Sequence, residues 1–274
     1  MAKLLKIGIV GCGAIGSSLA KTVIKDFQKE AKLTSLYDID KERSAVLSKS
    51  VFETRRLHVH SLKQLICKSD LVIEASSARA SFGIAQKVLA RGKGVMIMSV
   101  GGVAGHIKTL AALAKRRGGR VYIPSGAVSG IDALKAAGCA RLKKVCLTTY
   151  KNPASFRGVD IINRKKIDLD KIKKDTVIFC GSAREAIRLF PQNINVAGLL
   201  SIAGVGQDRT TVKIIASPAT KKNIHEIHIE SSAATIMTRT QNILHPDNPK
   251  TSYLAVLSAV AMLKQILEPV KIGT

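Results

Sequence analysis

Three glycines near the N-terminus have a spacing that could support nucleotide chemistry. They form a G-x-G-x-x-G pattern between an apolar run, residues 7–10, and residues 17–27, whose apolar side chains recur at helical spacing. A strand, a glycine turn and a helix in this order are typical of a dinucleotide site, where the helix N-terminus offers free N–H groups to the pyrophosphate. The cofactor-binding residues predicted here are Gly11, Gly13, Ala14, Ile15 and Gly16.

An acidic residue about twenty positions further on completes such a fingerprint. Asp38 stands at the end of a second predicted strand, residues 33–37, where its carboxylate can accept hydrogen bonds from the ribose hydroxyls. The alternative is that Asp38 starts a turn or caps the helix that begins near Lys41. A 2′-phosphate would meet the negative charge of Asp38, which favours NAD over NADP, although Lys41 and Arg43 would soften the repulsion. The predicted cofactor is therefore NAD or NADP, with NAD favoured.

A histidine further along the chain is the candidate acid or base. Residues 225–230 alternate as a strand does, with His225 on the apolar face and His228 among carboxylates on the other. An imidazole titrates near neutral pH and can accept and return a proton. This alternation alone leaves open whether His225 has a catalytic role or is a buried histidine of the core.

The elements that must position these residues alternate between strand and helix in the first part of the chain. This alternation predicts a doubly wound parallel sheet of the Rossmann type, an α/β fold. The expected strands are residues 7–10, 33–37, 70–75, 94–100 and 121–124, and the expected helices are 17–27, 41–50, 61–65, 78–91 and a segment around 110–115.

A change of pattern after residue 124 predicts a second, α+β domain. Residues 125–132 form a small-residue loop, which is either a ligand loop or an ordinary interdomain turn. Period-2 strands, expected to be antiparallel, are residues 144–150, 210–216, 225–230 and 235–240; helices are expected at 182–190, between Ser182 and Pro191, and at 193–203. We assign residues 1–124 to the Rossmann domain, completed by 248–274, and residues 125–247 to the α+β domain.

Composition limits the partners. The chain has 274 residues and a formal net charge of +25, but its basic residues are dispersed and aromatic residues make up only 4%. Without aromatic stacking platforms, nucleic acid is not the expected partner, whereas the positive field would attract a dicarboxylate. The five cysteines form no C-x-x-C pair and indicate a reduced, cytoplasmic protein. No membrane span and no metal-ligand constellation is predicted.

Several longer motifs follow one another along the chain. They are GIVGCGAIG at 8–16, SGAVSGIDALKAA at 125–137, GSAREAIRLFPQNINVAG at 181–198, DRTTVKIIASP at 208–218, NIHEI at 223–227 and NPKTSYLAVLSAVA at 248–261. Together they resemble, in order and over nearly the whole chain, the motifs of L-aspartate dehydrogenases of the type linked to NAD biosynthesis.

The resemblance implies a function and additional site residues. It implies that L-aspartate is oxidised to iminosuccinate, which hydrolyses to oxaloacetate and ammonia or passes to quinolinate synthase. The partner is then L-aspartate or another small dicarboxylate. It also implies that the second domain carries the active site and the contacts of a homodimer. By motif, the catalytic histidine is His225, and the cofactor-contacting residues are Ala127 and Asn195. Lys250 and Arg184 lie in matched motifs, but many cations could bind the substrate carboxylates.

Two other interpretations remain at this stage. The chain could be another two-domain NAD(P) oxidoreductase of a small acid, similar to dihydrodipicolinate reductase. It could also be a non-catalytic protein that senses a cofactor or binds nucleic acid, which would use the high positive charge.

Overall fold

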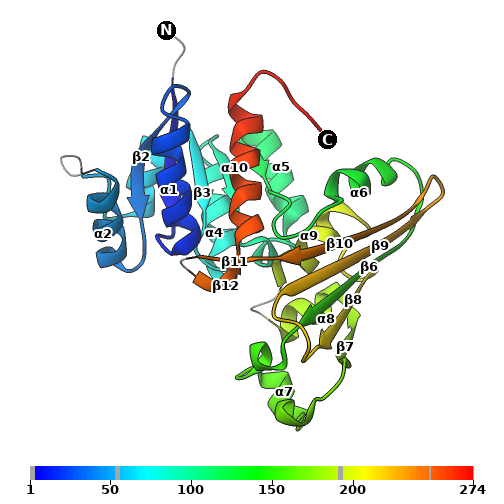
Figure 1. Ribbon diagram of the computed structural model, residues 1–274. Helices are drawn as coiled ribbons and strands as arrows, with labels where there is room; N and C mark the ends of the chain where they lie inside the picture. Colours follow the sequence, from blue (N-terminus) through cyan, green and yellow to red (C-terminus); the bar gives the residue numbers. More distant parts are fainter. Residues whose placement is uncertain (1–3, 53–55, 191–193, 247, 274) are drawn as a thin grey trace. The chain divides into compact units, whose positions relative to one another are not determined.

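The computed structural model of this protein describes residues 4–52, 56–190, 194–246 and 248–273 (Figure 1). The chain divides into two compact units. The first comprises Met1–Pro124 and Val256–Ile272, and the second comprises Ser125–Ala255 and Gly273–Thr274.

Among the described residues, the first unit contains a five-stranded parallel sheet with the strand order β2-β1-β3-β4-β5. The chain moves outward from β1 in both directions, which is the doubly wound arrangement that the sequence predicted. The strands are β1 (Leu5–Val10), β2 (Ala31–Tyr37), β3 (Leu71–Glu74), β4 (Gly94–Ile97) and β5 (Arg120–Tyr122). The helices are α1 (Ala14–Asp26), α2 (Lys41–Val51), α3 (Leu62–Lys68), α4 (Ala78–Leu89) and α5 (Ile107–Arg117).

The core of this unit joins the sheet to helices from both ends of the sequence. Figure 1 shows α1 beside α10 (Tyr253–Leu267), and both helices contribute to one buried cluster with β1. Val256, Ala259 and Leu263 of α10 are at most 3% exposed. Burial of a large aliphatic side chain stabilises a fold by roughly 1.5–3 kcal/mol, so this C-terminal helix is an integral part of the first unit.

The predicted elements of the first unit are present with shifted ends. The strand expected at residues 94–100 ends at Ile97, and Val100–Gly102 form a short 3-10 helix, η1. The helix expected from residue 17 begins at Ala14, directly after the glycine turn. Ser61 caps α3, as expected, by accepting a hydrogen bond of 3.2 Å from the backbone N–H of Gln64.

The described strands of the second unit form a five-stranded sheet with the order β10-β9-β6-β8-β7, and β11 pairs separately with β12. The expectation of antiparallel strands is right for most neighbours but wrong for one pair, because β6 and β8 run parallel. Long connections through helices separate these two strands, and such crossovers permit parallel pairing. The strands are β6 (Leu142–Lys151), β7 (Thr176–Ser182), β8 (Thr210–Ala216), β9 (Asn223–Ser231), β10 (Thr235–Asn242), β11 (Leu244–His245) and β12 (Asn248–Ser252).

The sequence correctly predicted where one helix of this unit, α8, begins. Ser182 and Glu185 form a capping box at the start of α8, as the predicted serine cap required. Pro191, expected to end this helix, lies outside the described residues. The helices are α6 (Ile131–Ala137), α7 (Asp160–Arg164), α8 (Ala183–Leu189) and α9 (Ile194–Ala203), with 3-10 turns η2 (Pro153–Phe156) and η3 (Leu169–Lys171).

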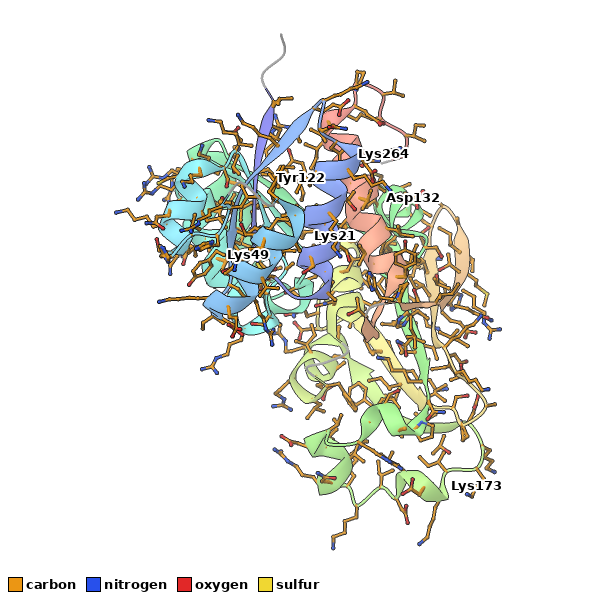
Figure 2. The ribbon with its side chains drawn as sticks, turned by 60° about the vertical axis from the view of Figure 1, so that its left-hand side comes forward. Lys21, Lys49, Tyr122, Asp132, Lys173 and Lys264 are labelled. Atoms are coloured by element: carbon orange, nitrogen blue, oxygen red, sulfur yellow. The ribbon has the colours of Figure 1, made fainter. Side chains whose placement is uncertain are left out.

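Basic side chains are spread over many elements. Figure 2 labels Lys21 on α1, Lys49 on α2, Lys264 on α10 and Lys173 after η3, and each of these four side chains is exposed. The net charge therefore does not arise from a single segment. Within the described part of the chain, no helix combines the length and the apolar character needed to cross a membrane.

Candidate active site

The glycine loop between β1 and α1 is closely packed at two of its three glycines. Gly11 has a φ of +94°, and a Cβ there would lie 2.3 Å from the carbonyl oxygen of Ala75. A Cβ at Gly16 would lie 1.9 Å from the carbonyl oxygen of Gly11. A Cβ at Gly13, in contrast, would have no atom within 4 Å, so the loop is open at the position where a pyrophosphate must approach.

The first turn of α1 lies directly after this opening. Gly13 precedes the helix, and Ala14 and Ile15 are its first two residues, both half-buried. No acidic side chain lies in this turn, and no side chain caps the helix at Gly13. The unpaired N–H groups of a helix N-terminus and its positive dipole end attract an anion, so these residues fit the phosphates of a dinucleotide.

Asp38 supports the same loop from the end of β2. One of its carboxylate oxygens accepts a hydrogen bond of 2.7 Å from the backbone N–H of Cys12, and the other accepts one of 3.0 Å from that of Asp40. Asp40, rather than Asp38, caps α2, with a bond of 3.1 Å from the N–H of Glu42. Asp38 is thus fixed beside the glycine loop, and its two oxygens keep lone pairs that ribose hydroxyls could use.

Cys12 lies inside this loop and is buried. Burial, together with the nearby charge of Asp38, raises the pKa of its thiol to about 12. A surface hollow of about 330 Å³ also reaches Cys12 and is lined by Ser17, Lys21, Asp40, Arg43 and Leu47 among others.

Glu74, at the end of β3, is a buried acid to which the sequence analysis assigned no role. Its side chain accepts hydrogen bonds from the backbone N–H and the hydroxyl of Ser76, and from those of Ser99, at 2.8–3.1 Å. Burial raises the pKa of the Glu74 carboxyl, although these hydrogen bonds act in the opposite direction. Glu74 therefore ties together the segments that follow β3 and β4, at the carboxyl edge where doubly wound sheets bind ligands.

His225 lies on the covered face of the second sheet and is only 7% exposed. It is directly opposite Thr149 on β6 and Thr240 on β10. The Thr149 hydroxyl oxygen is 3.0 Å from His225 Nδ1. Burial, and to a lesser extent the charge of Lys151, lowers the pKa of His225 to about 3. The imidazole is therefore neutral at physiological pH, as a general base must be.

Lys151 is a residue that the sequence interpretation missed, because the predicted strand ended at residue 150. It is the last residue of β6 and lies two positions after Thr149, so both side chains point to the same face. Lys151 is half-buried, and burial lowers its pKa to about 8. Extending the period-2 pattern of β6 by one residue would have identified it.

The loop of residues 125–132 is held by the end of β10. Asn242, which is 1% exposed, donates a hydrogen bond of 2.9 Å to the carbonyl oxygen of Ala127. The hydroxyls of Ser129 and Thr240 lie 3.0 Å apart, and Thr240 is the strand neighbour of His225. These contacts link the Ala127 loop to the row of residues that contains His225. Neither Asn242 nor Thr240 carries a motif that would reveal this from sequence.

Asn195, Arg184 and Lys250, which lie in the matched motifs, belong to three other elements of the second unit. Asn195 lies in the first turn of α9 and is exposed. Arg184 is exposed and forms an ion pair with Asp208, with a guanidinium nitrogen 2.8 Å from the carboxylate. Lys250 belongs to β12, but its side chain lies outside the described part of the structure. Among the described residues, no group of His, Cys, Asp and Glu side chains could hold a metal ion.

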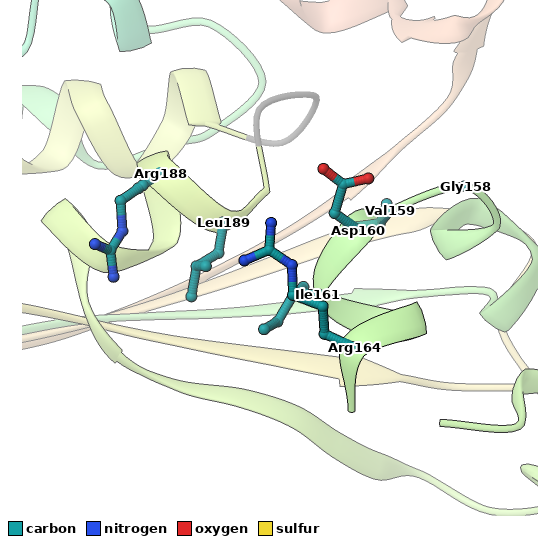
Figure 3. A pocket seen from close by; sticks show the side chains of 7 residues that line it. All are labelled: Gly158, Val159, Asp160, Ile161, Arg164, Arg188 and Leu189. Carbon is teal, nitrogen blue, oxygen red and sulfur yellow. The ribbon is translucent and has the colours of Figure 1, made fainter. Parts of the chain in front are cut away.

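A larger hollow, of about 460 Å³, contains none of the predicted site residues. It is lined by α7 and the end of α8, including Asp160, Arg164, Arg188 and Leu189. Figure 3 shows the guanidinium group of Arg164 directed into this hollow, between Asp160 and Leu189. Volume alone therefore does not locate the candidate site in this protein.

The parallel sheet, the glycine loop and the acid at the end of β2 define a dinucleotide-binding protein of the Rossmann class. Residues 11–124 match the model of the NAD-binding domain of homoserine dehydrogenase, and residues 132–266 match that of the C-terminal region of aspartate dehydrogenase. An L-aspartate dehydrogenase of Methanococcoides burtonii is 44% identical over 99% of this chain and 100% of its own. That of Methanosarcina mazei is 41% identical at the same coverage. The chain therefore belongs to the L-aspartate dehydrogenase family.

Solved structures agree with this assignment. The crystal structure of aspartate dehydrogenase from Thermotoga maritima has a TM-score of 0.76 and 26% identity, covering 99% of this chain and 100% of the other. A hyperthermophilic archaeal homoserine dehydrogenase in complex with NADPH has a TM-score of 0.61 at 13% identity, and covers 98% of this chain and 100% of its own. At that identity, the second comparison shows the shared fold alone.

Proposed function

We propose that this protein oxidises L-aspartate to iminosuccinate with NAD or NADP as the acceptor. The observation that carries the substrate assignment is the 44% identity, over nearly the full chain, to a protein named L-aspartate dehydrogenase. The neutral, buried imidazole of His225 and the open glycine at residue 13 supply the groups that this chemistry needs.

The first unit binds the cofactor in this proposal. Gly11, Gly13 and Gly16 shape the loop, and the first turn at Ala14 and Ile15 holds the pyrophosphate. Asp38 accepts the adenosine ribose hydroxyls, and its charge favours NAD over NADP. When bound, the oxidised nicotinamide accepts a hydride from the substrate Cα.

The second unit acts on the substrate in this proposal. His225 takes a proton during amine oxidation, so that L-aspartate and NAD⁺ give iminosuccinate, NADH and H⁺. His225 then activates water for attack on the imine carbon, and addition of one water gives oxaloacetate and ammonia. Ala127 and Asn195 contact the cofactor. The network of Thr149, Thr240 and Asn242 holds His225 and the Ala127 loop in place.

Further assignments, drawn from the sequence pattern, the cysteines and the family resemblance, belong to this proposal. Residues 248–274 complete the Rossmann domain, and residues 125–247 form the catalytic and dimerisation domain. The protein acts as a homodimer in the cytoplasm, and iminosuccinate can pass to quinolinate synthase. Light scattering after gel filtration tests the dimer, because a monomeric mass would contradict it.

The deciding experiment is NADH formation, followed by absorbance, with L-aspartate, L-glutamate and D-aspartate as substrates. We expect activity with L-aspartate that falls by roughly 10²–10⁴-fold in His225→Asn, the range of a lost general base. NADH binding should be nearly unchanged in this variant. If the wild type binds NADH but reduces neither NAD nor NADP with L-aspartate, the assignment is wrong. Reduction of a cyclic imine would then favour the dihydrodipicolinate-reductase-like alternative.

A further inference from the structure

One face of the second sheet carries a cation beside the candidate base. Thr149 and Lys151 are alternate residues of β6 and therefore share a face, and Thr149 is directly opposite His225. Lys151 is thus a diagonal cross-strand neighbour of His225. Such positions lie on the order of 7–8 Å apart, which is within reach of a long side chain such as that of lysine.

Two other cations of these strands, Lys144 and Arg239, lie close to carboxylates. Lys144 and Arg239 lie 3.4 Å from Glu230 and Glu226, respectively. Glu226 pairs with Thr148 and Arg239, so these side chains are on the face opposite to that of His225. Among the described residues of β9 and β10 and the regularly paired part of β6, from Lys144 onward, Lys151 is the Lys or Arg that shares a face with His225.

The environment of Lys151 suits an anionic ligand. Lys151 is half-buried, and attraction to an opposite charge is stronger there than at the open surface because less water screens it. Thr149 lies directly opposite His225, so Lys151, two residues further along β6, faces the same region of the sheet as the imidazole. Electrostatics therefore favours a carboxylate at this position.

We propose that Lys151 binds a carboxylate of the substrate and holds it beside His225. This inference rests on the proposed function, because it assigns a specificity residue to the same site. Lys151 donates charge-assisted hydrogen bonds from its ammonium group to the carboxylate oxygens, and the carboxylate does not react. Lys151 selects acids and orients Cα, while His225 handles the protons.

The direct test is calorimetric titration of succinate, a dicarboxylate without the amine, into the NAD⁺-loaded protein. We expect the wild type to bind succinate and Lys151→Met to bind it roughly 10- to 100-fold more weakly, the loss for a hydrogen bond to a charged group. Lys151→Arg, which keeps a cation, should recover part of the affinity. Lys144→Met is the matched control, since it removes a lysine from the opposite face of the same strand.

The outcomes separate this inference from the proposed function. Equal succinate affinity of the wild type and Lys151→Met, or no succinate binding to the wild type, overturns the role of Lys151. A wild type that binds succinate through Lys151 but does not oxidise L-aspartate contradicts the proposed substrate and leaves the carboxylate site standing. Unchanged NADH affinity and melting temperature in Lys151→Met would show that the variant is folded; if it is not, Lys151→Gln replaces it.

Kinetics then identify the carboxylate that Lys151 binds. If it is the side-chain carboxylate, Lys151→Met raises the KM for L-aspartate and reduces the preference for L-aspartate over L-asparagine. If it is the α-carboxylate, the KM values for L-aspartate and L-asparagine rise to the same extent, and the preference between them is unchanged. A KM for L-aspartate within twofold of the wild type in an active Lys151→Met enzyme contradicts the proposal.

Discussion

Thr149 and His225 lie opposite each other on neighbouring antiparallel strands, with the threonine hydroxyl oxygen 3.0 Å from Nδ1 of the imidazole. This contact occupies one ring nitrogen and leaves Nε2 for a second partner. If Nδ1 donates its proton to the Thr149 oxygen, Nε2 carries the lone pair that a base requires. The regular strand pairing of β6 and β9 thus fixes the orientation of the His225 ring.

Burial of His225 predicts a pH dependence of stability. Its pKa is lowered to about 3 in the folded protein and lies near 6.5 in the unfolded chain, so the unfolded state binds more protons between these values. Stability is therefore lost as the pH falls from about 6.5 towards 3. Urea denaturation of the wild type and of His225→Asn at pH 7 and 4.5 measures this contribution. We expect the free energy of unfolding to be lower at pH 4.5 than at pH 7, and the decrease to be on the order of 2 kcal/mol larger in the wild type than in His225→Asn. Equal decreases in the two proteins would contradict this prediction.

Lys151 predicts a pH dependence of substrate binding at the alkaline end. Burial lowers its pKa to about 8, so the ammonium loses its proton as the pH rises through 8. His225 on β9 is a titratable group on the same face as Lys151, and Glu226 and Arg239 lie on the other face. We expect the KM for L-aspartate to rise roughly tenfold per pH unit above 8. In Lys151→Arg the KM should stay level, since guanidinium remains charged; an identical rise would assign it to another group.

Two glycines of the cofactor loop should respond differently to the same substitution. A Cβ at Gly13 has free space, so Gly13→Ala should fold normally and weaken NADH binding by occupying the space of the pyrophosphate. A Cβ at Gly16 would meet the Gly11 carbonyl oxygen at 1.9 Å, so Gly16→Ala should lower the melting temperature. Thermal melting and NADH fluorescence titration separate the two effects. Loss of stability in Gly13→Ala without loss of affinity would contradict this assignment.

Asp38 should control the choice between NAD and NADP. Asp38→Asn removes the charge that repels a 2′-phosphate and keeps one oxygen that can accept the N–H of Cys12 or Asp40. We expect the ratio of kcat/KM for NADP to that for NAD to rise by about tenfold, equivalent to roughly 1.4 kcal/mol. Lys41→Met and Arg43→Met should change the ratio in the opposite direction if these cations soften the repulsion. An unchanged ratio in Asp38→Asn would exclude Asp38 from cofactor selection.

Local signals predicted the first unit well. Fully buried strands such as Leu71–Glu74 are continuous apolar runs, and serine caps mark where helices begin. The second unit was harder, because β7 was not predicted. A register shift between Val177 and Phe179 buries Ile178 and Phe179 in succession, and this interrupts the alternation that identifies a strand.

Only part of the site could be predicted from sequence. The glycine pattern predicted the loop, and the family motif indicated His225, whose role stays a prediction. Thr149, Lys151 and Asn242 come from different strands and have no common motif. Their association depends on strand order and register, in particular on the pairing of β6 with β9, and these are tertiary properties.

The buried cysteine of the nucleotide loop bears on the chemical durability of the protein. Thiolates, rather than thiols, react with peroxides and alkylating agents. With a pKa of about 12, roughly one Cys12 side chain in 10⁵ is ionised at pH 7, whereas Cys67, Cys139 and Cys180 are exposed. Oxidative damage therefore falls first on the protein surface. Cys12, between Gly11 and Gly13, stays a thiol under the same conditions because of its raised pKa.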